Sequence, residues 1–278
     1  MSNALKDELR KLICEIAEID EIPDDAAFKS IASANMMAGK AGVDGVFSVT
    51  GYSSSLYARE VKQWRDGEIV VFHDPTLDRT TEATGPVKER SLAELRALDA
   101  GHRFRDAQGE HPFRGRGVQI PTLNELCEAF PGVPLNIEIK QSDPPIEAAV
   151  LAILDAHGAR ERTLLAAERA PLMQRIRAAA PDVATGMAAE EVMAFLGGRG
   201  DPAYRPPGKA LQVPVSYEGF PIVTAETLAS AHALGLEVHV WTVNEEAEME
   251  RLLDLGVDGL MSDFPGRVAA VLRRRGLR

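Results

Sequence analysis

The chain has 278 residues, 45% of them hydrophobic, and its 31 Lys and Arg against 42 Asp and Glu give a formal net charge of −11. A chain of this length can bury one large core, and α/β barrels of about this size commonly form one domain. We therefore expect a single domain over residues 1–278. The negative charge argues against nucleic acid or an anionic membrane as partner, because their phosphates would be repelled.

The two cysteines and the amino-terminal residues indicate the compartment. Cys14 and Cys127 lie far apart and match no metal-ligand spacing, so they are typical of reduced thiols. The first residues lack a signal-peptide pattern, and no apolar run reaches the roughly 18 residues of a membrane span. We expect a cytoplasmic protein without a membrane span; the sequence gives no indication of its oligomeric state.

The amino-terminal segment, residues 1–60, is predicted to be an atypical helical start to the domain. Apolar residues at spacings of three and four predict an amphipathic helix over 4–19. A second helix is expected over 24–40, opened by Asp24 or Asp25 and closed near Gly39. Residues 42–50 then alternate as a strand does.

A short apolar run, residues 69–72, stops at His73-Asp74-Pro75. Proline has no backbone N–H to donate to a ladder, so the strand must end there. The run thus places a titratable pair where a buried strand gives way to a loop, which is where α/β folds keep their chemistry. A lone His at such a position is more often scaffolding than a catalyst.

The region at about 83–122 is loop-rich, with one helix expected near 91–98, and is typical of a lid or cap. After it, strands and helices alternate, which predicts parallel pairing. The strands are expected near 134–139, 163–166, 183–187, 209–213, 237–243 and 258–262, and the helices include 146–157, 171–179, 224–234 and 245–255. With a further strand at 44–49 or 56–61, the series favours a TIM-type (β/α) barrel. A doubly wound sheet is the alternative, although no Gly-rich nucleotide-binding loop follows any strand.

Two of these strands carry polar residues among apolar ones. Glu138 and Lys140 lie two residues apart, so they share one face of a strand and should point into the barrel mouth. Buried charges cost several kcal/mol unless paired or liganded, so the two are either a structural ion pair or a site. Trp241 shares a face with His239 and Val243, which by pattern alone is more typical of barrel packing than of a ligand contact.

Four segments together resemble the glycerophosphodiester phosphodiesterase family, over roughly residues 69–278. They are Ile-Val-Val-Phe-His-Asp-Pro-Thr-Leu-Asp-Arg-Thr-Thr (69–81), Ser-Leu-Ala-Glu-Leu-Arg-Ala-Leu-Asp-Ala-Gly (91–101), Ile-Pro-Thr-Leu (120–123) and Leu-Asn-Ile-Glu-Ile-Lys (135–140).

The resemblance implies a fold, a reaction and a set of site residues. The family cleaves glycerophosphodiesters, small-molecule substrates, to glycerol 3-phosphate and an alcohol with the help of a divalent metal, Mg²⁺ or Ca²⁺. On this basis His73 is the expected catalytic acid or base, Glu138 a metal ligand, Lys140 a contact of the substrate phosphate and Trp241 a lining residue of the substrate pocket. Asp263 resembles a family Asp that supports the site.

The amino-terminal family motifs are absent, however. The family has a second catalytic His in a His-Arg-Gly motif, whereas this chain has no His before His73. The family's Glu-x-Asp metal ligands correspond to Phe47 and Val49 in a local match. If the chain is instead aligned with the family by counting back from His73 without gaps, one carboxylate of the Glu-x-Asp motif is retained, as Glu60. Glu60 and Glu138 are therefore the candidate metal ligands.

Three hypotheses follow. In the first, the chain is a divergent phosphodiesterase with impaired activity that recruits Glu60 or another amino-terminal carboxylate. In the second, it is a catalytically incomplete barrel that binds a phosphorylated ligand or a protein partner. In the third, its first 60 or so residues came from elsewhere and leave the family chemistry incomplete. All functional readings require His73, Glu138, Lys140 and Trp241 to converge on one mouth of the barrel.

Overall fold

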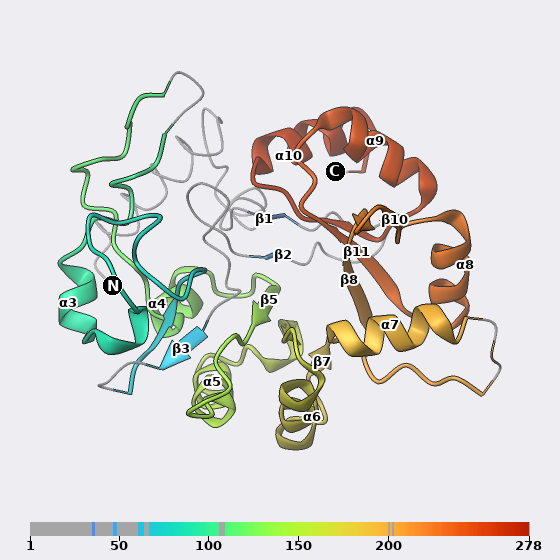
Figure 1. Ribbon diagram of the computed structural model, residues 1–278, viewed down its shortest axis with the longest axis horizontal. Helices are drawn as coiled ribbons and strands as arrows, with labels where there is room; N and C mark the ends of the chain where they lie inside the picture. Colours follow the sequence, from blue (N-terminus) through green and yellow to red (C-terminus); the bar gives the residue numbers. More distant parts are fainter. Residues whose placement is uncertain are drawn as a thin grey trace.

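A series of parallel strands forms the centre of the protein (Figure 1). The computed structural model describes residues 35–36, 47–48, 61–63, 67–105, 109–199, 201 and 203–277. One parallel set comprises β2 (Phe47–Ser48), β5 (Leu135–Glu138), β6 (Thr163–Ala166) and β7 (Ala184–Thr185). A second comprises β8 (Ala210–Pro214), β11 (Glu237–Trp241) and β12 (Gly259–Leu260). A parallel bridge from Gly186 to Ala210 joins the two sets.

The order of these strands decides between the two predicted architectures. Neighbours follow one another in chain order, β2-β5-β6-β7-β8-β11-β12. A doubly wound sheet reverses its order at a switch point, and this series does not. The α/β class and the strand positions predicted after residue 130 are confirmed, and the doubly wound alternative is not supported.

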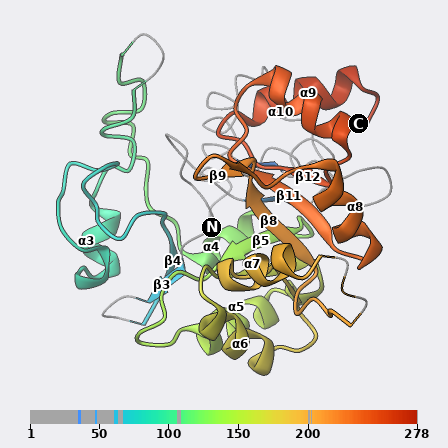
Figure 2. The same ribbon diagram turned by 45° about the vertical axis from the view of Figure 1, so that its right-hand side comes forward.

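Helices follow the strands and lie around their outside, as Figure 2 shows. They are α5 (Glu147–Ala156), α6 (Ala170–Ala179), α7 (Ala189–Gly197), α8 (Ala225–Ala233), α9 (Glu246–Leu255) and α10 (Pro265–Arg274). A short 3₁₀ turn, η2 (Arg160–Arg162), precedes β6. Buried apolar residues of the strands and helices form one continuous core. Leu135, Ile137 and Ile139 belong to it, so the alternate residues Asn136 and Glu138 face the other side of the sheet.

The segment before His73 forms a hairpin. β3 (Val61–Gln63) pairs antiparallel with β4 (Ile69–Val71), with Val61 opposite Val71. Since β2 is the strand that pairs in parallel with β5, the prediction of a barrel strand at 44–49 is supported over the one at 56–61. β4 is fixed to the following chain by a hydrogen bond from the Val71 amide to the Pro121 carbonyl, 2.9 Å.

The region at 83–122 is a packed cap, which we call the cap below; its residues 106–108 are not described. It contains η1 (Val87–Glu89) and α3 (Leu92–Arg96), which confirms the helix predicted near 91–98. Val70, Phe72, Leu77, Val87, Leu95 and Ile120 form a second small core between the cap and β4. The next helix, α4 (Leu123–Ala129), was not predicted, although a Thr122–Glu125 capping box marks its start.

One local expectation needs correction. The helix expected over 24–40 is wrong at β1 (Asn35–Met36), which pairs antiparallel with β2; strand pairing there overrides the local helix signals. The helix predicted at 4–19 lies outside the described residues.

A hairpin of β9 (Ser216–Tyr217) and β10 (Phe220–Pro221), also not predicted, turns at Glu218 and Gly219, whose φ angles are 48° and 83°. Positive φ at both central residues is what a two-residue hairpin turn requires.

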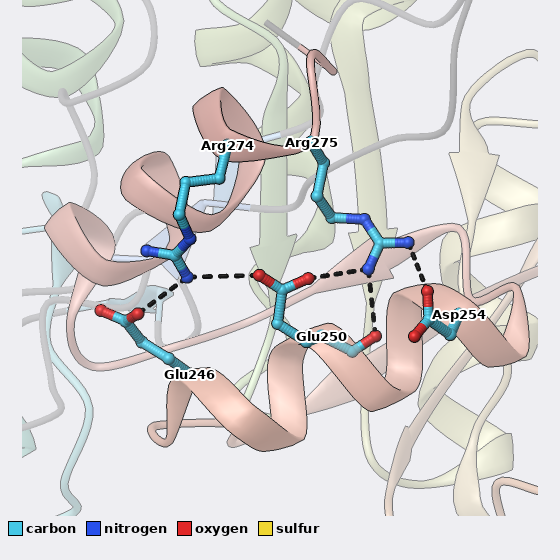
Figure 3. Close-up of polar contacts among 5 residues, drawn as sticks. All are labelled: Glu246, Glu250, Asp254, Arg274 and Arg275. Atoms are coloured by element: carbon cyan, nitrogen blue, oxygen red, sulfur yellow. Dashed lines mark hydrogen bonds and ion pairs between the residues drawn. The ribbon is translucent and has the colours of Figure 1, made fainter.

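The carboxyl-terminal helix is tied to its neighbour by ion pairs (Figure 3). On α9, Glu250 accepts hydrogen bonds from Arg275, 2.7 Å, and Arg274, 3.2 Å. Arg274 also pairs with Glu246, 2.8 Å, and Arg275 with Asp254, 2.5 Å. The hydrogen bond from Arg275 is the main cause that lowers the pKa of Glu250 below its usual value. The network fixes the last turn of α10 on α9.

We expect Glu250→Gln to lower the Tm at pH 7 and low salt by no more than about 4 °C, because exposed ion pairs contribute little each. Since the folded-state pKa is lowered, the contribution is complete above the unfolded pKa and lost as pH falls. The loss should therefore shrink at pH 3 and in 1 M salt. Thermal unfolding measures it, with the exposed Glu161→Gln as control; an effect independent of salt would contradict an electrostatic origin.

Candidate active site

The end of β4 carries a histidine held by a half-buried carboxylate. His73 Nδ1 lies 2.6 Å from Asp74 Oδ1, and the second carboxylate oxygen accepts from Arg79 Nε at 2.5 Å. The side chains of His73 and Asp74 are 32% and 16% exposed. Burial alone would raise the pKa of Asp74, but hydrogen bonds from His73 and Arg79 outweigh it and hold the pKa well below its usual range. Asp74 is therefore ionised, so Nδ1 carries the donated proton and Nε2 remains for other partners.

The end of β5 carries an ion pair. Lys140 Nζ lies 3.0 Å from Glu138 Oε1, and their side chains are 26% and 14% exposed. Glu138 pairs in register with Ala166 of β6, and the Ile139 amide continues the ladder to the Ala166 carbonyl at 2.8 Å. The small Ala166 side chain leaves room on the face that Glu138 occupies. The prediction that Glu138 and Lys140 share one face is confirmed.

Trp241 is the last residue of β11 and pairs in register with Pro214 of β8. The loop that follows it is fixed to the loop after β12: Asn244 Nδ2 donates to Asp263 Oδ2 at 2.9 Å, and Asn244 Oδ1 accepts from the Asp263 amide, also at 2.9 Å. Ser262 Oγ donates to Asn244 Oδ1 at 3.2 Å. These bonds hold two neighbouring strand ends together at the carboxyl edge.

A cavity of about 320 Å³ lies between the cap and the strand ends, lined by Pro75, Thr76, Pro86, Lys88 and Gln141. Pro75 directly follows Asp74, and Gln141 directly follows Lys140. The two segments that leave β4 and β5 therefore line one cavity. Because β5 and β11 belong to one series of parallel strands, Trp241 lies at the same edge as Glu138.

The predicted residues are thus arranged as follows. Glu138 and Lys140 are in contact, His73 lies at the strand end beside the shared cavity, and Trp241 lies at the same edge of the sheet. Glu60 lies outside the described residues.

Residue-by-residue reasoning missed two supporting groups. Arg79 fixes Asp74, and it is the Arg of the segment Asp-Arg-Thr-Thr. Asn244 fixes Asp263, and it is the Asn that ends the segment Trp-Thr-Val-Asn. The only signal for either was its place in a motif, because the Arg79–Asp74 contact depends on how one loop folds and the Asn244–Asp263 contact forms between two loops.

The comparisons place the chain in a family. The model of the glycerophosphoryl diester phosphodiesterase family matches residues 61–267. The chain belongs to this family. It is 30% identical to a glycerophosphodiester phosphodiesterase of Bacillus subtilis (strain 168) over 74% of this chain and 72% of that one. It is also 30% identical to one of Caldanaerobacter subterraneus over 78% of this chain and 85% of that one.

Solved structures agree with the fold. A glycerophosphoryl diester phosphodiesterase-family protein from Silicibacter pomeroyi DSS-3 is 28% identical, with a TM-score of 0.64 over 78% of this chain and 82% of that one. The fold is the TIM-type barrel of this family, as predicted. Among the described residues, no helix is both long and apolar enough to cross a membrane.

Enzymes of this family generally depend on a divalent metal, so we tested whether the described residues could hold one. Within the described ranges, no three His, Cys, Asp or Glu side chains lie close enough together to do so. The Glu138 carboxylate is instead paired with Lys140. A hard divalent ion needs about six oxygen ligands, several of them from carboxylates or water. The described residues do not by themselves fit a metal.

We expect Asp74→Asn to reduce the free energy of unfolding at pH 7 by about 2 kcal/mol, because it removes charge-assisted hydrogen bonds from His73 and Arg79. The pKa of Asp74 is depressed in the fold, so its contribution is complete above the unfolded value near about 4 and is lost as pH falls below it.

Urea unfolding at pH 7 and pH 3 measures the difference. The exposed Asp143→Asn serves as control and should change stability little at either pH. An Asp74→Asn deficit as large at pH 3 as at pH 7 would show that packing, not charge, holds this residue.

Proposed function

We propose that the chain hydrolyses glycerophosphodiesters to glycerol 3-phosphate and an alcohol. The observation that carries the proposal is the pairing of charged groups at two strand ends beside one cavity, His73 with Asp74 and Glu138 with Lys140. Family membership over residues 61–267 supports the same reaction. The substrate is a small molecule, and the chain's charge of −11 disfavours nucleic acid as an alternative diester.

The geometry suggests a division of work among the chain's own residues. The Lys140 ammonium can turn from Glu138 to a phosphate oxygen and offset the charge that develops there. His73 uses Nε2 to move the proton as water adds to phosphorus and the alcohol oxygen leaves, while Asp74 holds the ring and stabilises its charged form. Trp241 supplies an apolar wall for the substrate. Hydrolysis then needs one further proton-transfer group, for which water is the simplest candidate.

We propose Glu138 as a ligand of a divalent ion, Mg²⁺ or Ca²⁺, with Glu60 as its partner. Glu138 competes for this role with its own ion pair to Lys140. Glu60 lies outside the described residues, so its support is the gap-free count back from His73 to the family's Glu-x-Asp motif in the sequence. We expect metal binding to be weak and whatever activity remains to require it.

The alternative is a barrel that binds a phosphorylated ligand or a protein partner without turnover. Two observations favour it: the sequence has no His before His73, and the described residues contain no three-ligand metal cluster. Loss of one acid–base group typically lowers a rate by about 10²- to 10⁴-fold. We therefore expect turnover well below that of a family member with both motifs.

We further propose that residues 1–278 form one barrel domain, with 1–60 as its atypical amino-terminal segment, and that the protein is cytoplasmic. The state of Cys127 supports this location, since it is free and buried, and burial raises the pKa of its thiol to about 11. A free thiol of this kind is typical of a reducing compartment.

We expect His73→Ala to lower kcat for glycerophosphocholine by about 10²-fold or more, because it removes the proton-transfer group. His232→Ala is a matched control: its Nε2 also bonds a carboxylate, Asp258 at 2.7 Å, at the amino ends of β11 and β12, opposite the carboxyl ends that carry the proposed site. A coupled assay for glycerol 3-phosphate measures both variants. Equal rates for His73→Ala and the parent protein would overturn the role of His73.

We expect Glu138→Ala, like a chelator, to abolish the remaining activity and any stabilisation of the fold by Mg²⁺ or Ca²⁺. Thermal unfolding with and without each ion gives a readout independent of turnover. A protein that binds a phosphodiester but shows no turnover with any divalent ion would establish the binding alternative.

A further inference from the structure

The walls of the cavity beside the active site are fixed by backbone contacts. On one side, the Val87 amide donates to the Pro75 carbonyl at 3.0 Å, and Thr76 forms an antiparallel bridge with Pro86. On the other side, Gln141 Nε2 donates to the Pro144 carbonyl at 2.8 Å. A cavity with fixed walls can bind part of a ligand without a large ordering cost.

The cavity has a mixed lining that defines what it can take. Pro75 and Pro86 present apolar rings, and Lys88 is the one lining residue that carries a charge. Lys88 is exposed, and within the described ranges no carboxylate lies in ion-pair contact with it. The chain as a whole has a net charge of −11, so a cation at the cavity is a local exception to the repulsion of anions.

The position of the cavity fits the alcohol side of the proposed substrate. Gln141 follows Lys140, the proposed phosphate contact, so a phosphate at Lys140 would have the cavity directly beside it. The part of a diester that extends from the phosphate is either glycerol or the leaving alcohol. A volume of about 320 Å³ is ample for a head group of a few heavy atoms.

We propose that this cavity selects a leaving alcohol that carries its own anionic group, with Lys88 as the specificity-determining residue. The inference rests on the proposed function. The substrate class is a glycerophosphodiester with a carboxylate on the alcohol: Lys140 contacts the phosphate, Lys88 the carboxylate, and Pro75 and Pro86 pack on the aliphatic carbons between them. Lys88 thereby distinguishes such alcohols from purely cationic ones.

Two substrates isolate the carboxylate. Glycerophosphoserine and glycerophosphoethanolamine differ only by that group, so their ratio of kcat/KM cancels effects on the phosphate and on folding. We expect the parent protein to prefer glycerophosphoserine and Lys88→Met to lower the ratio by about fivefold, the size typical of a solvent-exposed charge contact. Lys88→Arg should retain most of the preference. Lys209→Met, an exposed lysine at the amino end of β8, should leave it unchanged.

The outcomes separate this inference from the proposed function. If Lys88→Met lowers kcat/KM for both substrates equally, Lys88 does not read the carboxylate and the inference fails, while the phosphodiesterase assignment stands. If the parent protein hydrolyses neither substrate, the assignment fails. In that case the ratio of the two dissociation constants, measured by calorimetry on the parent and Lys88→Met, still decides the role of Lys88. An unchanged ratio overturns it, and a fivefold rise in the dissociation constant for glycerophosphoserine relative to that for glycerophosphoethanolamine in Lys88→Met supports it.

Discussion

The alternation of side chains along β5 is the constraint on which the rest of the site depends. The strand is paired on both sides, with β2 and β6, so it cannot shift register without exposing Leu135 and Ile137, which are fully buried. With those residues committed to the core, Glu138 must face the inside of the barrel. Its charge is then expensive to bury, and Lys140, two residues further on the same side, offsets that cost.

The cap stabilises β4 by packing against it. Among the described residues, this strand pairs with β3 and with one residue of the returning chain, Thr122, so this pairing alone would leave it weakly held. The small apolar core around Phe72 and Leu77 fixes the cap on it. The same packing holds the loop that carries His73 and forms one wall of the cavity, so the cap contributes both to stability and to the shape of the cavity.

Charge is distributed unevenly around this fold. Most of the described arginines on the outer helices are paired, as in the network of Arg274 and Arg275 on α9. These contacts fix helices but leave no surplus positive charge. Against that background, Lys88 lines the cavity and Lys140 directly precedes its lining residue Gln141, and the anion selectivity proposed above depends on these two cations in an otherwise acidic protein.

The sequence by itself determined the class of fold, the parallel strands after residue 130, four of the helices between them and the shared face of Glu138 and Lys140. All of these depend on periods of two and 3.6 residues, which are local and survive without knowledge of the partners. Only the tertiary structure decided that β2 rather than β3 pairs with β5, that Asn35–Met36 form a strand, and that Arg79 and Asn244 fix the site. The strand pairings and the Asn244–Asp263 contact join segments that are separate in the sequence, and the Arg79–Asp74 contact depends on how a single loop folds. The free energy of such contacts outweighs local propensity without leaving a period in the sequence.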